Sequence, residues 1–290
     1  MLIGVSDRSL IRTVTVKSWP QLMDEVYQES WDEQLGRHRS PFVFRGICDA
    51  RADLSTSLMR LGDAAYPDLA KLENHLLRNF RKYAHSAGAE MGKSVWNWLA
   101  LAQHHGLHTR LLDWTYSPLV AAHFAMDTLA TFGVDGAIWC VNHRKTLELL
   151  PAALKEVADP QGVDVFTAEM LDEVAGSLEA FDALSDTEFV VFMEPPSLDE
   201  RIVNQFALFS LVSNPSRKFN DWLADHPDIA KKIVIPAGMK WELRDKLDQA
   251  GITERVLLPG LDGLSRWLSR YYTPKSKFAP RNEPGCPEPE

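Results

Sequence analysis

Cysteine is scarce in this chain. Only three occur among 290 residues, Cys48, Cys140 and Cys286, and no two of them are closely spaced. This spacing predicts neither a disulfide framework nor a zinc knuckle. Widely separated thiols are typical of proteins from a reducing compartment, so we expect a cytoplasmic location.

Long apolar runs are missing as well. No stretch reaches the roughly 18 uncharged apolar residues that suggest a membrane-spanning helix. The opening sequence MLIGVSDR has no basic flank followed by a sustained apolar core, so no signal peptide is predicted. We therefore expect no membrane partner.

Basic residues are fewer than acidic ones. The chain has 31 Lys and Arg against 40 Asp and Glu, which gives a formal net charge of -9. A broad nucleic-acid-binding surface is therefore not expected, although a local basic cleft remains open. The sequence also lacks the phosphate-binding loops G-x-x-x-x-G-K and G-x-G-x-x-G, the G-x-S-x-G elbow and the H-E-x-x-H metal motif. These absences argue against the enzyme classes that depend on those motifs.

Three histidines, His104, His105 and His108, lie close together in the sequence. A zinc site is not predicted, because the two adjacent imidazoles would diverge and no carboxylate or thiolate stands at ligand spacing. We interpret one of them, His104, as a hydrogen-bonding residue in a pocket wall together with Gln103.

The composition, 45% hydrophobic and 24% charged, is that of an ordinary globular protein. Helices are predicted over residues 15–35, 67–86, 94–104, 119–131, 241–249 and 261–272, and strands over 42–45, 109–115, 137–141, 188–193, 206–209, 231–236 and 256–258. Because strands and helices do not alternate strictly, the pattern indicates an α+β fold. We expect one domain over residues 1–272, with a helical insertion at 145–187 and a disordered proline-rich tail at 273–290.

Arg45 is the most informative residue. It follows the apolar run PFVF, which is typical of a buried strand, and Gly46 ends that run. A guanidinium at the end of such a strand is costly to bury unless an anion meets it. Arg45 therefore either forms a structural ion pair or binds an anionic ligand, and Gly46 would leave room for a ligand to approach the backbone.

The segment TRLLDWT, residues 109–115, carries a second group of polar side chains. Alternate residues of a strand share one face, which places Asp113 beside Thr115, just before a helix that Ser117 and Pro118 begin. Backbone N–H groups at such a helix start favour an anion such as phosphate. Alternatively these side chains only cap the helix, an interpretation that is stronger for Ser117 than for Asp113.

A third segment, residues 201–209, has Arg201 and Gln205 as polar members of an otherwise apolar stretch. If the segment is extended, these two side chains share one face. That face is either half-exposed to solvent or directed toward the cleft of Arg45. Glu194 and Glu200 are carboxylates at the edge of this region.

These segments resemble a known family. The tripeptide Phe44-Arg45-Gly46, the stretch QHHGLHTRLLDWTYSP over residues 103–118 and the following AAHFA are similar to the FRG domain family, which takes its name from Phe-Arg-Gly. The resemblance extends over roughly residues 15–270 and is most specific over 103–125.

A weaker resemblance leads to the R-S-E group of ADP-ribosyltransferases. In those enzymes an arginine ends a first strand, a strand with a Ser/Thr-x-Ser/Thr motif follows, and a later strand carries a catalytic glutamate. Arg45 and the tripeptide Thr115-Tyr116-Ser117 stand in the first two places here. The resemblance implies a split mixed or antiparallel sheet with surrounding helices, NAD as the substrate, and Arg45 holding its phosphate or ribose. The glutamate has no clear counterpart: Glu200 is the best-placed candidate, Glu194 the second, and Gln205 a non-acidic substitute.

The resemblance therefore implies an NAD-binding domain with ADP-ribosyltransferase or NAD glycohydrolase activity, and family analogy suggests a bacterial stress or phage-defence effector. No metal is expected. The expected catalytic residues are Arg45, Glu200 and Gln205, and the expected NAD-binding residues are Arg45, Gly46, Gln103, His104, Arg110, Asp113, Thr115, Ser117 and Arg201. The alternative is a non-catalytic module that binds a protein or a nucleotide-like ligand, with Arg45 in a structural ion-pair network.

Overall fold

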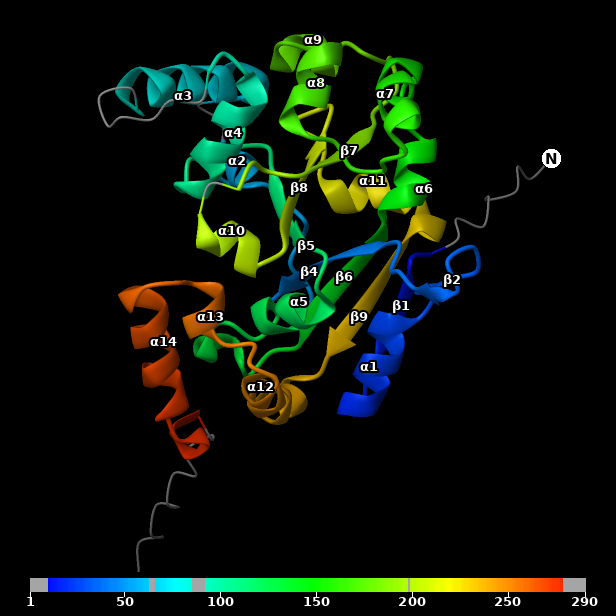
Figure 1. Ribbon diagram of the computed structural model, residues 1–290. Helices are drawn as coiled ribbons and strands as arrows, with labels where there is room; N and C mark the ends of the chain where they lie inside the picture. Colours follow the sequence, from blue (N-terminus) through cyan, green and yellow to red (C-terminus); the bar gives the residue numbers. More distant parts are fainter. Residues whose placement is uncertain (1–9, 63–65, 85–91, 198, 279–290) are drawn as a thin grey trace, which may run out of the picture.

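The computed structural model describes residues 10–62, 66–84, 92–197 and 199–278 (Figure 1). Its centre is a seven-stranded sheet in which β1 and β9 are parallel and all other neighbouring pairs are antiparallel. The strand order is β1 (Arg12–Thr15), β9 (Ala230–Ile235), β6 (Gly136–Asn142), β4 (Phe42–Ile47), β5 (Leu112–Thr115), β8 (Ala207–Val212) and β7 (Val190–Met193). A separate two-stranded ribbon consists of β2 (Trp31–Asp32) and β3 (Arg37–His38). The mixed sheet and its surrounding helices confirm the predicted α+β class.

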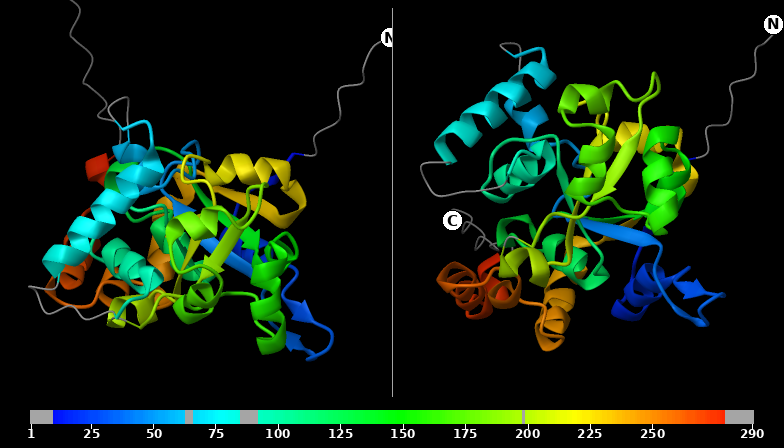
Figure 2. Two further views of the ribbon diagram at one scale, coloured as in Figure 1. Left: turned by 90° about the horizontal axis from the view of Figure 1, so that it is seen from above. Right: turned by 45° about the horizontal axis from the view of Figure 1, so that its top comes forward.

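Helices surround this sheet (Figures 1 and 2). The α-helices are α1 (Trp19–Tyr27), α2 (Ser57–Leu61), α3 (Leu69–Ala84), α4 (Val95–His104), α5 (Pro118–Phe124), α6 (His143–Glu148), α7 (Ala152–Ala158), α8 (Ala168–Val174), α9 (Leu178–Asp182), α10 (Glu200–Asn204), α11 (Phe219–Asp225), α12 (Lys240–Gln249), α13 (Glu254–Leu257) and α14 (Leu261–Tyr271). Short 3-10 helices occur at Leu129–Thr131, Asp159–Gln161, Pro227–Ile229, Ala237–Met239 and Lys275–Phe278. None of the described helices combines the length and the apolar character that a membrane crossing requires.

The alternation of side chains along β4 divides the core. Phe42 and Phe44 belong to a buried cluster with residues of α1, α5 and α12. Val43 points to the opposite face of the sheet, where it belongs to a cluster with residues of β5, β8 and α11. A third cluster joins α4, α8 and α9 to β7 and β8. With both faces covered, β4 is a central strand, and Arg45 follows three buried residues directly.

The sheet opens between β4 and β5. The two strands pair only at Phe44 and Thr115, whereas β4 pairs with β6 over its whole length, from Phe42 to Ile47. After Phe44, β4 therefore has no strand neighbour on its β5 side. This divergence places Arg45 at the edge of a gap inside the sheet.

Gly46 serves a different purpose from the predicted one. A Cβ atom on Gly46 would lie 1.9 Å from the backbone oxygen of Ala121 and 2.6 Å from the backbone nitrogen of Ala125. The space beside this glycine is therefore filled by α5 and its C-cap residue Ala125, so the glycine allows close packing of a helix and leaves no room for a ligand on its Cβ side.

Replacing Gly46 by alanine should lower the free energy of unfolding by about 3 kcal/mol, because either β4 or α5 must move. Chemical denaturation followed by circular dichroism measures the change. Gly133→Ala is the matched control, since a Cβ there meets no atom within 4 Å, and it should change stability by less than about 0.5 kcal/mol. Equal stabilities of the two variants would contradict the proposed close packing.

One predicted strand is wrong, and the segment 201–209 is extended only from Ala207 on, where β8 confirms the strand predicted over 206–209. The apolar run at residues 256–258 was predicted as a strand, but α13 occupies Glu254–Leu257 and only Leu257 of the run is buried. Residues 201–204 lie in α10, whose first turn is capped by the side chain of Asp199. Short apolar runs do not distinguish a strand from one helical turn. As a result, Arg201 and Gln205 do not share a strand face.

Other boundaries shift. The helix predicted over residues 15–35 ends at Tyr27. Two residues later Glu29 adopts a positive φ of 59°, and the β2–β3 ribbon follows. The helix predicted over 119–131 ends at Phe124, before the 3-10 turn Leu129–Thr131. Within the predicted insertion 145–187, the chain forms most of α6 and all of α7, α8 and α9. The tail predicted to be disordered over residues 273–290 begins with a 3-10 helix at Lys275–Phe278, which contradicts the prediction for that part, and its residues 279–290 lie outside the described residues.

Candidate functional site

A cavity of about 380 Å³ lies where β4 and β5 diverge. Its lining comes from β4, β5, α4, α5, α10 and β8, which are far apart in the sequence. The lining residues are Phe44, Arg45, Gly46, Ile47, Cys48, Gln103, Asp113, Trp114, Thr115, Phe124, Asp127, Arg201, Gln205 and Ala207. The structure thus brings seven predicted site residues together: Arg45, Gly46, Gln103, Asp113, Thr115, Arg201 and Gln205.

The guanidinium of Arg45 is only partly neutralised in this cavity. Its Nη1 donates to the backbone oxygen of Asp113 and lies 3.7 Å from Oδ2 of the same residue. Its Nε is buried and has no hydrogen-bond partner among the described residues. The side chain is 21% exposed, whereas that of Asp113 is 61% exposed. Burial lowers the pKa of Arg45, and the carboxylate of Asp113 only partly offsets this effect.

A chain of hydrogen bonds orients Asp113. Nε2 of Gln103 lies 3.2 Å from each carboxylate oxygen of Asp113 and donates to them. The hydroxyl of Thr109 in turn donates to Oε1 of Gln103 over 2.6 Å, which fixes the direction of the amide. Thr109 therefore positions Gln103, and Gln103 holds the carboxylate on the wall that also carries Arg45.

Thr115 and Gln205 build the frame of the cavity. The hydroxyl of Thr115 donates to the backbone oxygen of Gln205 over 2.6 Å and accepts from the backbone nitrogen of Ser117. Nε2 of Gln205 donates to the backbone oxygen of Leu257 over 2.8 Å, which ties α10 to α13. Ser117 caps α5 by accepting from the backbone nitrogen of Val120 and does not line the cavity. These contacts occupy the hydroxyl of Thr115 and the amide nitrogen of Gln205, so their role is to hold the walls in place.

Phe206 adopts an unusual backbone conformation at this point, with a φ of 48°. Bulky residues rarely occupy this region. The turn directs the backbone oxygen of Phe206 to the backbone nitrogen of Tyr116 and leaves its own side chain 58% exposed. It joins α10 to β8 at the wall of the cavity.

Arg201 connects the cavity to a second hollow of about 610 Å³. The side chain of Arg201 is exposed and forms no hydrogen bond or ion pair with the described residues. The second hollow is lined by His104, His105, Asp199, Glu200, Arg201, Leu258, Pro259, Asp262 and Arg266. His104 contributes through an Nε2 atom that lies 2.8 Å from Oδ2 of Asp199.

The predicted catalytic carboxylates lie outside the cavity. Glu200 faces the second hollow from the first turn of α10. Glu194 accepts from the hydroxyl of Tyr116 over 2.8 Å and lines neither space. Within the described part of the chain, Asp113 and Asp127 are the carboxylates that line the cavity.

Asp127 is engaged with basic residues. Nη2 of Arg266 donates to both of its carboxylate oxygens, over 2.9 and 2.8 Å, and Nε2 of His123 lies 3.5 Å from Oδ1. Burial raises the pKa of Asp127, but His123 and Arg266 outweigh this effect and lower it. Asp127 is therefore held ionised and paired, which leaves Asp113 as the more accessible carboxylate.

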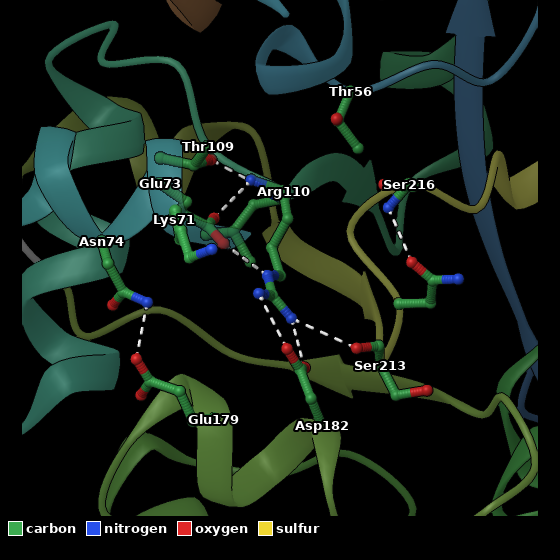
Figure 3. A network of polar contacts seen from close by, with 12 residues as sticks. Thr56, Lys71, Glu73, Asn74, Thr109, Arg110, Glu179, Asp182, Ser213 and Ser216 are labelled. Carbon is green, nitrogen blue, oxygen red and sulfur yellow. Dashed lines mark hydrogen bonds and ion pairs between the residues drawn. The ribbon is translucent and has the colours of Figure 1, made fainter. Parts of the chain in front are cut away.

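Arg110 lies elsewhere, in the core (Figure 3). Its Nε donates to Glu73 over 2.6 Å, and its two terminal nitrogens donate to the carboxylate oxygens of Asp182 over 2.5 and 3.2 Å. The residue is 2% exposed and does not line the cavity. Burial lowers the pKa of Arg110, but the two carboxylates outweigh it and raise the pKa. Arg110 ties α3 and α9 to the segment just before β5, so it is not part of the candidate site.

The sequence reasoning missed Cys48, Phe124 and Asp127 as lining residues. Cys48 comes two residues after Gly46, and its thiol donates to the backbone oxygen of Phe124. Asp127 carried a usable signal, since it is a single carboxylate within an apolar segment predicted as helical. Within the described ranges, no group of three or more His, Cys, Asp or Glu side chains could hold a metal ion.

Comparison with known proteins yields one family. Residues 40–132 match the model of the FRG domain, which spans β4 to α5 and contains Arg45, Gln103, Asp113 and Thr115. Arg201 and Gln205 lie outside the matched range. Neither the curated proteins nor the solved structures include a match to the chain. The arginine-centred part of the cavity is thus the part that the family model covers, and the chain contains an FRG domain over residues 40–132.

Proposed function

We propose that the cavity between β4 and β5 binds an NAD-like dinucleotide and that the protein transfers ADP-ribose or hydrolyses NAD. The observation that carries this proposal is the state of Arg45. Its guanidinium borders a cavity, its Nε is buried without a partner among the described residues, and the nearest carboxylate in that part of the chain is 3.7 Å away and mostly exposed. A phosphate would supply the missing charge and acceptors in one group.

The contrast with Arg110 supports a ligand-binding role for Arg45. The guanidinium of Arg110 forms ion pairs with two carboxylates, as a buried structural arginine requires. Arg45 instead donates to a backbone oxygen and lies 3.7 Å from a mostly exposed carboxylate. The cavity volume of about 380 Å³ lies in the range of small-molecule sites. Arg201 leads from it into the second hollow, which gives room for the remainder of a dinucleotide.

The chemistry requires a carboxylate near the ribose. Cleavage of NAD breaks the bond between C1′ of the ribose and the nicotinamide nitrogen, and the electron pair leaves with nicotinamide. Positive charge develops on the ribose, and an oxygen of water or of an acceptor then attacks C1′ and loses its proton. A fixed carboxylate stabilises that charge. We assign this role to Asp113 in place of Glu200, because Gln103 orients it and its side chain is accessible.

Calorimetric titration of NAD into the folded protein tests the binding step. We expect saturable binding with one site per chain and competition by ADP-ribose. Release of nicotinamide, followed by chromatography, tests the reaction. An absence of heat at millimolar NAD, with the protein folded by circular dichroism, would contradict the proposal.

Replacing Asp113 by asparagine should reduce the rate of nicotinamide release by about 10² to 10³, because the developing charge loses its fixed counter-charge. NAD affinity should change by less than about tenfold, since the amide keeps the shape of the side chain. Glu200→Gln is the matched control and should leave the rate at saturating NAD unchanged, because Glu200 faces the second hollow, which takes the remainder of the dinucleotide and not the bond that breaks. The reverse result would return the catalytic role to Glu200.

The absence of a glutamate among the described residues that line the cavity favours a second candidate, a domain that binds NAD without cleaving it. In that case NAD binds to the wild-type protein and no nicotinamide is released. Asp113→Asn then changes no rate of nicotinamide release, because the wild-type protein has none. The two measurements together separate the candidates.

A further inference from the structure

The cavity and the second hollow share a border that carries two arginines. Arg201, from α10, lines both spaces. Arg266, from α14, lines the second hollow and pairs with Asp127, which lines the cavity. Both arginines lie outside the range that the FRG model matches. A ligand that extends from the cavity into the second hollow therefore passes two guanidinium groups.

Arg266 keeps N–H donors for an external anion. Its side chain is 50% exposed, and its Nη2 alone donates to both carboxylate oxygens of Asp127. A guanidinium has five N–H donors, and Nε and Nη1 of Arg266 have no hydrogen-bond partner within the described ranges. By contrast, Arg270 of the same helix is 6% exposed, and all three of its nitrogens donate to Glu254 or Asp248. Asp127 thus fixes the position of Arg266 without using all of its donors.

The helix that carries Arg201 is anchored at its start. Oδ1 of Asp199 accepts from the backbone nitrogen of Ile202 over 3.1 Å, which caps α10. Oδ2 of Asp199 lies 2.8 Å from Nε2 of His104, in the last turn of α4. Asp199 is occupied by these two contacts, so the exposed guanidinium of Arg201 is not neutralised by the acidic residue nearest to it in α10's cap.

The two arginines belong to neighbouring helices that pack together, since α10 lies next to α13 and α13 leads into α14 (Figure 1). Nε2 of Gln205, the C-cap residue of α10, donates to the backbone oxygen of Leu257 in α13. A Cβ on Gly263 would lie 1.8 Å from the backbone oxygen of Leu258, so α14 packs closely against the end of α13. This packing holds both guanidinium groups near the border before a ligand arrives, which reduces the entropic cost of binding.

We propose that Arg201 and Arg266 bind the second phosphate of the dinucleotide, on its adenosine side, while Arg45 binds the phosphate on the nicotinamide side. This inference rests on the proposed binding of NAD in the cavity. Arginine donates to phosphate oxygens through charge-assisted hydrogen bonds, which are stronger than those to neutral acceptors. The pair would therefore make the site selective for a dinucleotide over a mononucleotide.

The remainder of the second hollow is acidic. Its carboxylates are those of Asp199, Glu200 and Asp262. Like charges repel at short range, so these carboxylates disfavour a phosphate deeper in the hollow. The border with the two arginines is thus the place for an anion, and the uncharged adenosine of NAD occupies the hollow beyond it.

Calorimetric titration of the full chain with NAD and with nicotinamide mononucleotide tests the inference, because the mononucleotide has only the phosphate on the nicotinamide side. Arg266→Gln should lower the affinity for NAD at least about tenfold, since charge-assisted hydrogen bonds to the second phosphate are lost. Its affinity for the mononucleotide should stay within about threefold of the wild-type value. Arg266→Lys should recover part of the affinity for NAD, because it restores the charge.

Arg144→Gln is the matched control. Arg144 is also 50% exposed and forms an ion pair with Asp164, but it lines neither the cavity nor the second hollow. This variant should bind NAD within about threefold of wild type. Circular dichroism confirms that each variant is folded.

Three results would contradict the inference. Equal affinities of Arg266→Gln and Arg144→Gln for NAD would overturn it and leave NAD binding in the cavity intact. An equal loss of affinity for NAD and for the mononucleotide would also overturn it, because Arg266 would then act on the shape of the cavity and not on the second phosphate. A wild-type protein that binds neither ligand would overturn the proposed function as well.

Discussion

Replacing Arg110 by methionine should lower the free energy of unfolding by about 3–5 kcal/mol, because the change leaves the buried carboxylate of Glu73 without a cation. The side chain of Glu73 is 1% exposed, and its two oxygens accept from the backbone nitrogen and the Nε of Arg110. Asp182 would also lose its bidentate partner (Figure 3). Denaturant titration followed by circular dichroism measures the loss.

Two further variants test the cause of that loss in the free energy of unfolding. Arg144→Met removes a half-exposed partner of Asp164 and should cost less than about 1 kcal/mol, because surface ion pairs contribute little. Adding Glu73→Gln to Arg110→Met should recover part of the stability, since the uncompensated charge is then gone. A loss below about 1 kcal/mol in Arg110→Met would mean that the network of Figure 3 does not hold α3 and α9 to the sheet.

Arg45→Lys should weaken NAD binding by about 10- to 100-fold while leaving stability within about 1 kcal/mol of wild type. Lysine keeps the charge but cannot present two parallel donors to a phosphate, and hydrogen bonds to charged groups are worth about 1.5–3 kcal/mol. Stability should hold because, among the residues that the structure describes, Arg45 donates to a single backbone oxygen and its carboxylate neighbour is mostly exposed. Calorimetric titration and denaturation of the same sample measure both effects.

Arg60→Lys is the matched control for this change. Arg60 is close enough for its charge to lower the pKa of Arg45, but it does not line the cavity, and its Nη1 donates to the backbone oxygen of Ser55. It should bind NAD within about threefold of wild type. If Arg45→Lys instead loses several kcal/mol of stability and keeps its affinity, Arg45 belongs to a structural network and the proposed site is wrong.

Much of the site could be predicted because local signals mark it. The apolar run before Arg45 indicated a central strand, and the structure places Phe42, Val43 and Phe44 in two clusters on opposite faces. Asp113 and Thr115 precede a helix whose start Ser117 and Pro118 specify through capping. Those signals depend only on neighbours in the chain, and they correctly indicated the central strand and the capped helix beside which Arg45, Asp113 and Thr115 lie.

The roles of the other site residues could not be predicted, because they depend on contacts with residues far away in the sequence. Arg45 follows an apolar segment and Arg110 precedes one, and no local feature of the sequence shows that their roles differ. Arg110 is a structural residue because α3 and α9 bring Glu73 and Asp182 to it from 37 and 72 residues away. Glycine at position 46 likewise suggested access for a ligand, whereas α5 fills that side.

By itself, the sequence determined the α+β class, the central strand, the capped helix after β5 and the resemblance to the FRG family, because hydrophobic periodicity and capping act over a few residues. The tertiary structure alone decided which arginine meets a cavity and which carboxylate stands beside it. It did so because β4 and β5 separate after one pair of residues, and charge compensation is a property of neighbours in space.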